Sequence, residues 1–277
     1  MIHLILACLL SLACLPAKAS AGDTVYIYSG PGASSDCLIQ TAATMEHFLK
    51  PAYQIKFISP EQLINDNWET DAALLIMPGG ADIPYTKALN GKGNQKIRSY
   101  VENGGSFLGI CAGSYYSGAF VDFAKGTPLE VEGARELAFF PGIVRGPILA
   151  PYDYQTLSGV RAAKILWNGT QSFLKDTVFT VYYNGGGYFV DAAEEKKATV
   201  LAFYNIEEKA PAIIECRVGR GRAILTGVHF EFDPRLLDPD NCYMKQIIPA
   251  LEDGNILRMQ LVENLLGRLN LKCDKDR

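Results

Sequence analysis

The chain has 277 residues, with 26 Lys and Arg against 30 Asp and Glu, and a formal net charge of −4. Hydrophobic residues make up 48% and charged residues 20%, which is the composition of a globular protein and excludes disordered, collagen-like and coiled-coil chains. The acidic balance gives no electrostatic reason to expect nucleic acid or anionic lipid as a partner.

The first 19 residues are expected to form a secretory signal peptide. An apolar run from Leu4 to Leu15 is followed by Pro16 and the small-residue pattern Ala17-Lys18-Ala19, after which cleavage is expected. The run is shorter than the ~20 residues that a membrane-spanning helix needs, so we favour a signal peptide over a membrane anchor. We therefore expect an exported protein, periplasmic or secreted, with one domain over residues 20–277 and no membrane segment after cleavage.

Strand and helix patterns alternate along the first part of this domain. Four apolar, β-rich runs are found at Thr24 to Tyr28, Gln54 to Ile58, Ala72 to Met77 and Ser106 to Ile110. Apolar residues at helical spacing separate them, for example Leu38, Ala42, Met45 and Leu49. This alternation predicts an α/β fold, with a flavodoxin-like sheet of mostly parallel strands and helices on both faces.

A turn-rich, aromatic segment from about Val131 to Tyr188 interrupts the alternation. Strand patterns then return at Leu201, Ile213 and Ile224, and a helix pattern follows at Leu257, Leu261 and Leu265. Because no linker or repeat divides the sequence, we expect one domain with an inserted excursion.

The segment Ser106-Phe-Leu-Gly-Ile-Cys111-Ala-Gly-Ser-Tyr115 is an apolar strand that ends abruptly in a turn of small residues. In α/β proteins such a turn raises a nucleophile above the carboxyl ends of the strands, and Gly109 and Gly113 permit the strained backbone. The N-terminus of the following helix favours the thiolate form of Cys111. A buried structural cysteine is the alternative, but the local context favours a nucleophile.

A cysteine nucleophile needs a base, and His229 follows the apolar run Ala223 to Leu225. It is therefore expected at the same edge of the sheet as Cys111. Glu231, two residues further on, is expected on the same side of an extended segment, where its carboxylate would orient the imidazole. His47 is the competing histidine, and we interpret it as a surface residue beside the apolar stripe of a helix.

The run Ala73-Leu-Leu-Ile-Met-Pro78-Gly79-Gly80 is a strand that leads into a turn without bulky side chains. The backbone N–H of Gly80, together with that of Ala112, could form an oxyanion hole with two donors. A plain tight turn is the alternative reading of this run.

These segments resemble the class I glutamine amidotransferase superfamily. More closely, the chain resembles the amidotransferase-like N-terminal domain of eukaryotic-type biotin–protein ligases. That closer resemblance rests on Tyr28-Ser-Gly-Pro-Gly32, Met77-Pro-Gly-Gly-Ala-Asp-Ile-Pro-Tyr85, Leu89-Asn-Gly-Lys-Gly-Asn94, Arg135-Glu-Leu-Ala-Phe-Phe-Pro-Gly142 and Tyr183-Asn-Gly-Gly-Gly187. By this resemblance Cys111, His229 and Glu231 correspond to the Cys-His-Glu triad of the superfamily.

The sequence departs from the glutaminase pattern at Tyr115, where the superfamily usually has a glutamine that helps to hold the substrate. We therefore expect a poor glutaminase. The chain also leaves no room for an attached synthase or ligase domain, so we expect hydrolysis rather than transfer. The Gly219-Arg220-Gly221-Arg222 run lies between two strand patterns and is interpreted as a hairpin turn, not as an adenylate-binding loop.

Two functions from different classes remain. The first is a cysteine hydrolase that acts on a C–N amide bond of a small molecule or peptide, with Gly79, Tyr115, Tyr183 and Asn184 as candidate substrate-binding residues. The second is a non-catalytic module that binds a small molecule or partner and keeps the fold.

We expect no cofactor and no metal site, because the two histidines that remain after the expected cleavage, without a metal-binding motif, leave no ligand cluster in the sequence. Export favours oxidised thiols, so some of the cysteines other than Cys111 are expected to pair, with Cys242 and Cys273 as the first choice.

Overall fold

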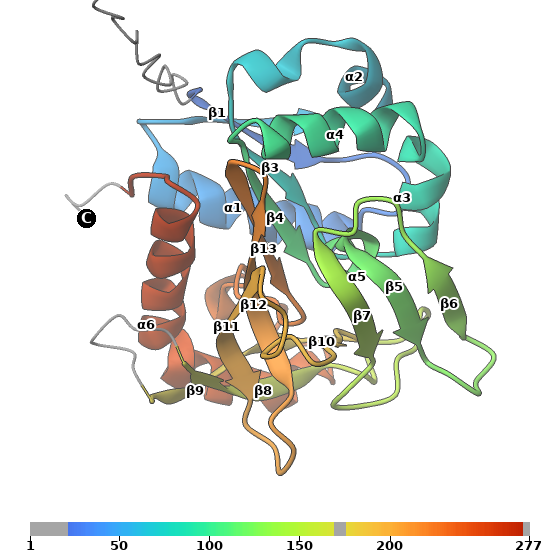
Figure 1. Ribbon diagram of the computed structural model, residues 1–277. Helices are drawn as coiled ribbons and strands as arrows, with labels where there is room; N and C mark the ends of the chain where they lie inside the picture. The colour runs from blue at the N-terminus through green and yellow to red at the C-terminus, as the bar shows by residue number, and fades with distance from the viewer. Residues whose placement is uncertain (1–21, 169–175, 274–277) are drawn as a thin grey trace, which may run out of the picture.

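The computed structural model describes residues 22–168 and 176–273 (Figure 1). The predicted signal peptide lies outside these ranges. The strands are β1 (Thr24–Tyr28), β2 (Gln54–Ile58), β3 (Ala72–Met77), β4 (Ser106–Ile110), β5 (Gly118–Phe123), β6 (Val131–Ala134), β7 (Phe140–Gly146), β8 (Arg161–Trp167), β9 (Val178–Tyr183), β10 (Tyr188–Phe189), β11 (Ala198–Tyr204), β12 (Pro211–Val218) and β13 (Gly221–Thr226). The helices are α1 (Ser35–Leu49), α2 (Pro60–Asn65), α3 (Asp82–Leu89), α4 (Lys92–Glu102), α5 (Ala112–Ser117) and α6 (Met244–Arg268), with short 3-10 helices at Trp68–Thr70 and Pro234–Leu236.

The main sheet has nine strands in the order β2-β1-β3-β4-β13-β12-β11-β8-β9. The first five of these pair in parallel, in the strand order of a flavodoxin-like sheet. The predicted fold class is therefore confirmed, and the four predicted strands coincide with β1 to β4. Because the five strands run in parallel, their carboxyl ends meet at one edge of the sheet.

The second half of the main sheet is antiparallel, and the turn-rich excursion supplies part of it. Strands β8 and β9 come from the excursion and pair with each other and with β11. Other excursion strands join β5 in a separate sheet of order β10-β7-β5-β6 (Figure 1). The sequence pattern did not predict these strands, because they are short and separated by glycine- and proline-rich turns that hide their alternation. The hairpin predicted at residues 219–222 is confirmed as the turn between β12 and β13.

Helices cover both faces of the main sheet (Figure 1). On one face Met45 of α1 and Leu265 of α6 belong to the same core as Ile76 of β3. On the other face Ile97 of α4 packs in a second core with Phe107 of β4. Successive residues of the central strands alternate between the two cores, as the two-residue period of a strand requires. The strands are thus held rigidly beneath the edge where their carboxyl ends meet.

All five cysteines in the described part of the chain are free. The predicted pairing of Cys242 with Cys273 is wrong, and α6 gives the physical reason. One cysteine precedes this helix of 25 residues and the other follows it. A helix of that length extends roughly 37 Å, whereas a disulfide requires Cα atoms within about 7 Å of one another.

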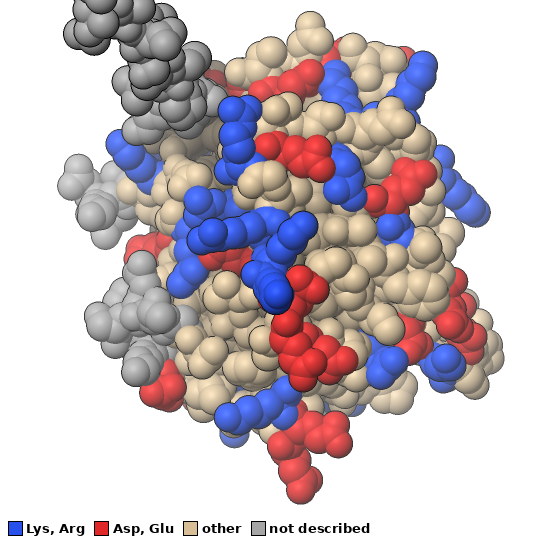
Figure 2. Space-filling model, in the orientation of Figure 1, with Lys and Arg blue, Asp and Glu red and all other residues tan. Residues whose placement is uncertain are grey.

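Basic and acidic side chains lie side by side on the face shown in Figure 2. Glu215 of β12 forms ion pairs with Arg222 of β13 at 3.4 Å and with Arg268 of α6 at 2.8 Å. Among the described residues, no helix has the length and apolar character needed to cross a membrane.

Candidate active site

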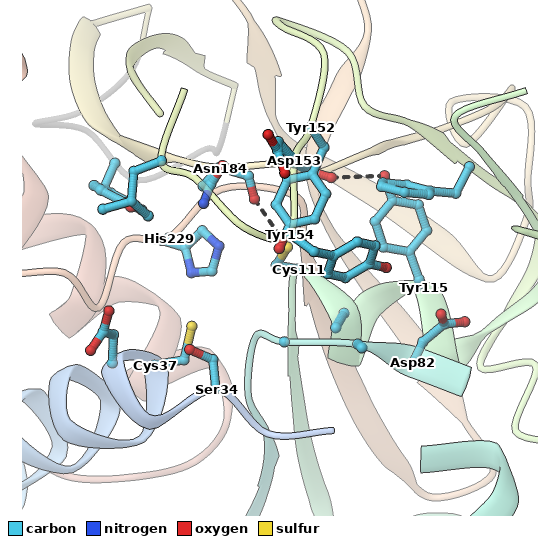
Figure 3. A pocket seen from close by; sticks show the side chains of 18 of the residues that line it. Ser34, Cys37, Asp82, Cys111, Tyr115, Tyr152, Asp153, Tyr154, Asn184 and His229 are labelled. Carbon is cyan, nitrogen blue, oxygen red and sulfur yellow. Dashed lines mark hydrogen bonds between the residues drawn. The ribbon is translucent and has the colours of Figure 1, made fainter. Parts of the chain in front are cut away.

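A pocket of about 260 Å³ opens at the edge where the carboxyl ends of the parallel strands meet (Figure 3). Its wall combines residues that lie far apart in the sequence. They include Ser34 and Cys37 from the start of α1, Gly80 after β3, Cys111 after β4 and His229 after β13. Parallel-sheet proteins bind their ligands at this edge, so the pocket is the first place to look for chemistry.

Cys111 lies in the sharp turn between β4 and α5. Its φ of 50° is in the left-handed region, which costs a residue with a side chain about 1–3 kcal/mol. The backbone N–H of Cys111 donates to the carbonyl of Thr226 at 2.8 Å and ties the turn to β13. A Cβ at Gly113 would lie 2.0 Å from the carbonyl oxygen of Met77, so only glycine fits there. The predicted sharp turn at Cys111 is therefore present, and contacts with the neighbouring strands stabilise its strained backbone.

His229 and Glu231 form a buried pair in the segment after β13. The Nδ1 atom of His229 lies 2.8 Å from Oε1 of Glu231, and the two side chains are 3% and 0% exposed. The backbone N–H of His229 donates to the carbonyl of Tyr182 at 2.8 Å, which joins the segment to β9. A carboxylate that accepts a hydrogen bond from Nδ1 keeps a proton on that nitrogen, so Nε2 is the atom that can exchange a proton with other groups.

Two opposing effects act on the pKa of His229. Burial lowers the pKa of an imidazole, but the charges of Glu231 and Cys111 outweigh it, so the pKa of His229 lies well above its usual range. Hydrogen bonding to Cys111 and Cys37 also raises the pKa of His229. The protonated imidazole is thus favoured beside the Cys111 thiol at neutral pH.

Polar side chains from two helices brace the segment that carries this pair. Thr44 of α1 donates its hydroxyl to the carbonyl of Glu231 at 2.7 Å. Arg258 of α6 is 3% exposed and donates from Nη1 to the carbonyl of Phe230 at 3.0 Å.

The same arginine also lies 3.6 Å from the carboxylate of Asp233. Burial raises the pKa of Asp233, but bonds from Arg235 and the charge of Arg258 outweigh it and hold that pKa below its usual range. An ionised Asp233 therefore anchors the end of the segment against both arginines.

The two residues predicted to form an oxyanion hole, Gly80 and Ala112, both lie in the pocket wall. Gly80 faces Ala33 in an isolated antiparallel bridge, in which the neighbouring residues make the hydrogen bonds. In the turns and loops of the described chain, neither Gly80 N–H nor Ala112 N–H donates to another backbone group. Both residues line the pocket, and their joint role as an oxyanion hole beside Cys111 stays a prediction.

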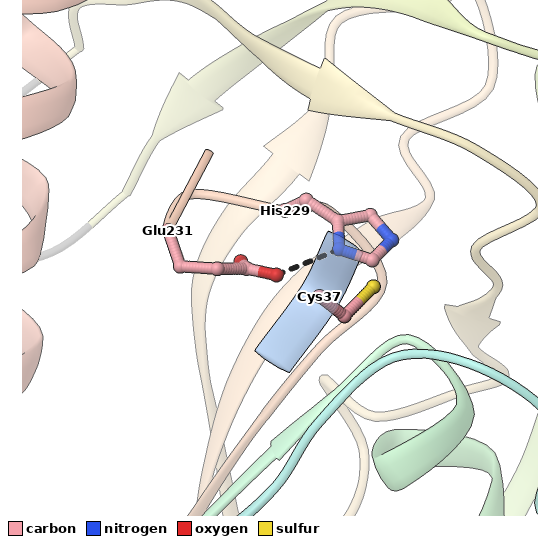
Figure 4. A group of neighbouring side chains, drawn as sticks. All are labelled: Cys37, His229 and Glu231. Atoms are coloured by element: carbon pink, nitrogen blue, oxygen red, sulfur yellow. Dashed lines mark hydrogen bonds and ion pairs between the residues drawn. The ribbon is translucent and has the colours of Figure 1, made fainter. Parts of the chain in front are cut away.

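Cys37 is a third neighbour of the imidazole that sequence reasoning missed (Figure 4). Ligand atoms of Cys37, His229 and Glu231 all lie within 4.8 Å of one another, so the fold forms a buried group that could hold a metal ion. The expectation of no metal site remains a prediction, but its argument that no ligand cluster forms is wrong. Burial raises the pKa of the Cys37 thiol, and a hydrogen bond with His229 partly offsets this.

A signal for Cys37 was present in the sequence. It lies in the first turn of the helix after β1, and therefore at the same edge of the sheet as Cys111. The expectation that Cys37 is among the cysteines that pair rests instead on export, which favours oxidised thiols. The helical period of the sequence does not show which face of the helix points toward the edge of the sheet.

Two of the predicted substrate-binding residues line the pocket. Tyr115 does so with its ring, while its hydroxyl donates to the carbonyl of Gly185 at 3.2 Å. Asn184 lies opposite Cys111, whose thiol donates to the Asn184 carbonyl at 3.6 Å. The side-chain oxygen of Asn184 is buried and has no hydrogen-bond partner among the described residues.

The other two predicted binding residues have structural contacts. A Cβ at Gly79 would lie 2.6 Å from Cε1 of His229 and 2.7 Å from Sγ of Cys37, so Gly79 gives the imidazole its space. Tyr183 is fully buried, and its hydroxyl accepts from the N–H groups of Ile148 and Leu149. His47 is exposed on α1, outside this pocket, as expected.

Aromatic residues that sequence reasoning missed complete the wall. Tyr152 and Tyr154 meet edge to face with ring centroids 4.8 Å apart, and both line the pocket. Tyr182 and Phe232 stack at 4.2 Å with an interplanar angle of 10°. Their place depends on the pairing of β8 and β9 with the rest of the sheet, which local patterns do not show.

Comparison with known proteins assigns the chain to a family. It belongs to the family described as the N-terminal part of biotin-protein ligase, which matches residues 23–277. A biotin–protein ligase of Schizosaccharomyces pombe is 36% identical over 255 residues, which cover 91% of this chain and 38% of that protein. An uncharacterised protein of Chlamydia muridarum is 35% identical over 251 residues, 88% of this chain and 90% of that protein.

The fold comparison agrees. A glutamine amidotransferase of Thermotoga maritima superposes with a TM-score of 0.54 and 13% identity, over 89% of this chain and 97% of that one. At this identity the likeness concerns the fold alone. The sequence matches confirm the resemblance to the ligase N-terminal domain, and the fold match shows that the chain has a glutamine amidotransferase-like fold.

Proposed function

We propose that this member of the biotin-protein ligase N-terminal family hydrolyses a C–N amide bond, with Cys111 as nucleophile, His229 as proton relay and Glu231 as the group that orients the imidazole. The observation that carries the proposal is the buried His229–Glu231 pair, at 2.8 Å, in the same pocket wall as the strained turn of Cys111. A pocket that only binds a ligand has no need of this combination.

In the first half of the proposed reaction the Cys111 thiolate attacks the amide carbonyl carbon. The carbonyl oxygen becomes an oxyanion, which the N–H groups of Gly80 and Ala112 stabilise. Protonated His229 then gives its proton to the amide nitrogen, the C–N bond breaks, and the amine leaves. A thioester on Cys111 remains.

In the second half, neutral His229 takes a proton from water while the water oxygen attacks the thioester carbonyl. Collapse of this second oxyanion breaks the C–S bond and releases the carboxylic acid. Glu231 stays ionised throughout and holds the Nδ1 proton. Cys111 leaves as the thiolate beside a protonated imidazole, which is the starting state.

The ligase activity named for the Schizosaccharomyces pombe relative is not carried over, because the match covers 38% of that protein. Glutamine is also not proposed as the substrate, since Tyr115 stands where the superfamily uses an amide side chain. We propose in addition that the protein acts after export, with residues 1–19 removed. Determination of the N-terminal sequence of the mature protein tests this.

An activated aryl ester, p-nitrophenyl acetate, tests the chemistry without knowledge of the natural substrate. We expect a burst of nitrophenolate and an acetyl group on Cys111 in peptide mass spectra, followed by slower turnover. Cys111→Ala should abolish the burst, and His229→Ala should slow acylation by about 10²–10⁴-fold. Cys242→Ala, which removes an exposed thiol, is the matched control and should leave the burst intact.

Acetylation of Cys111 no faster than that of Cys242 would refute the hydrolase. The alternative, a non-catalytic binding module, would then be favoured.

A further inference from the structure

The acidic residues of the pocket wall are not matched by basic ones. Asp36, Asp82 and Asp153 line the pocket, and no described lining residue is Lys or Arg. The charge of Asp82 is compensated by Arg135, which donates to its carboxylate from Nε at 2.8 Å and from Nη2 at 2.6 Å. Among the described residues, neither Asp36 nor Asp153 takes part in an ion pair. Two carboxylates without an ion-pair partner among the described residues therefore line the same pocket as Cys111.

The loop that carries Asp153 holds its carboxylate in place. Oδ1 of Asp153 accepts the N–H of Gln155 at 2.8 Å, and Oδ2 accepts the hydroxyl of Thr156 at 3.0 Å. The Gln155 N–H and the Thr156 hydroxyl keep the pKa of Asp153 below its usual range. These donors are neutral, so they orient the negative charge without cancelling it.

The groups deeper in the pocket do not offset the excess negative charge of the wall. The imidazole of His229 lies 2.8 Å from the carboxylate of Glu231, so even the protonated imidazole leaves no net positive charge on the pair. The side-chain oxygen of Asn184 adds a buried acceptor that has no donor among the described residues. A ligand with N–H donors and positive charge would donate to the Asn184 oxygen and would be attracted by the carboxylates of Asp36 and Asp153.

Aromatic rings supply the rest of the wall. Tyr152 and Tyr154 are the sequence neighbours of Asp153 and line the same pocket (Figure 3). Tyr182 and Phe232, which stack on each other, also line it. Ring faces attract cations through their quadrupole, by about 0.5–2 kcal/mol for each well-placed contact. Carboxylates combined with ring faces select ammonium and guanidinium groups, and an anionic group would meet repulsion from the same residues.

We propose that the pocket selects amides that carry a positively charged nitrogen, an ammonium or guanidinium group, which lies between Asp36, Asp153 and the tyrosine rings while the amide carbonyl lies at Cys111. The inference rests on the proposed hydrolase function, which supplies the scissile amide. Glutamine carries a free carboxylate as well as an ammonium group, and the described wall offers no Lys or Arg to the carboxylate, so we expect glutamine to be a poor match.

Methanethiosulfonate reagents of similar size and different charge test this without turnover. Aminoethyl methanethiosulfonate is cationic and sulfonatoethyl methanethiosulfonate is anionic. With either one the Cys111 thiolate attacks the thiosulfonate sulfur, a mixed disulfide forms and methanesulfinate leaves. Rates at Cys111 are measured by peptide mass spectrometry, with exposed Cys242 as the internal reference. The rate of each reagent at Cys111 is divided by the rate of the same reagent with 2-mercaptoethanol, which corrects for the intrinsic reactivity of the reagent.

We expect the corrected rate at Cys111 to be at least tenfold higher for the cationic reagent at low salt, since charged clefts change association rates by about 10–10³-fold. Asp153→Asn and Asp36→Asn should each reduce this ratio several-fold, and added NaCl should reduce it further. Asp253→Asn makes the same change on an exposed part of α6, outside the pocket, and should leave the ratio unchanged.

The outcomes separate the two proposals. A ratio near one, or a ratio that Asp36→Asn and Asp153→Asn do not change, overturns the cationic selectivity even if p-nitrophenyl acetate shows that Cys111 hydrolyses esters. A high ratio that depends on these aspartates supports the selectivity even if no ester turnover is found, in which case the hydrolase proposal alone fails.

Discussion

The space that Gly79 leaves for the imidazole can be tested by adding one carbon atom. Gly79→Ala would place a Cβ 2.6 Å from Cε1 of His229 and 2.7 Å from Sγ of Cys37. Gly79 does not have a positive φ, so alanine can adopt its backbone conformation and only the lack of space opposes it. The substitution therefore acts on the position of His229.

The contact distances set the size of the effect. Relaxed contacts between carbon atoms lie at about 3.5–4.0 Å, so the ring must retreat by about 1 Å. Overpacking of this kind costs about 1–3 kcal/mol of stability, and a displacement of about 1 Å at a catalytic group costs about 10²-fold in rate. We thus expect a lower melting temperature and a loss of about two orders of magnitude in acylation of Cys111.

The assay is the burst rate with p-nitrophenyl acetate together with the melting temperature. Gly267→Ala is the matched control, because a Cβ there meets nothing within 4 Å, and it should leave the burst unchanged. Adding Cys37→Ala to Gly79→Ala removes one of the two overlaps and should recover part of the lost rate. A burst rate for Gly79→Ala within twofold of the parent would refute the reasoning, because it would mean that His229 can move without consequence.

Three further predictions follow from the same contacts. Iodoacetamide should alkylate Cys111 at least about tenfold faster than exposed Cys242, and His229→Ala should remove the difference; equal rates in the parent would contradict an activated thiol. Asp233→Asn should cost roughly 2 kcal/mol of unfolding free energy at pH 7. Because the folded-state pKa of Asp233 is lowered, its stabilisation is present in full above about pH 4 and is lost as the pH falls through that pKa, so the difference in unfolding free energy between the parent and the variant should shrink as denaturant titrations are moved from pH 7 to acidic pH. The parent should release no more ammonia from glutamine than Cys111→Ala does, and Tyr115→Gln should increase the release if that position is the obstacle; robust release by the parent would restore a glutaminase.

The parts of the fold that the sequence predicted are those whose signal is local. Buried parallel strands appear as continuous apolar runs bounded by turn residues, so β1 to β4 were located with their observed bounds. Cys111 and His229 were found because each directly follows such a run. The order of parallel strands then brings the two residues to one edge of the sheet.

The parts that could not be predicted depend on pairing between distant segments. Strand β8 is placed by its hydrogen bonds to β11, more than 30 residues later in the chain, and the pocket walls of the excursion follow from that pairing. Cys37 reaches His229 only because α1 packs with one particular face toward the sheet. No period in the sequence contains that information, and the tendency of exported cysteines to pair pointed to the wrong role for this residue.

Polar residues on buried helix faces were nevertheless a signal that could have been used. Gln40 and Thr44 lie on the inner face of α1, and Arg258 lies on that of α6, although each position would more easily hold an apolar side chain. In the structure Gln40 accepts the N–H of Asp233 at 3.0 Å, while Thr44 and Arg258 donate to carbonyls beside the His229–Glu231 pair. Each residue breaks the apolar pattern of its helix in order to satisfy a buried backbone group of the segment after β13. Departures from the apolar pattern therefore mark where two helices support a loop that must stay fixed while it carries a charged pair.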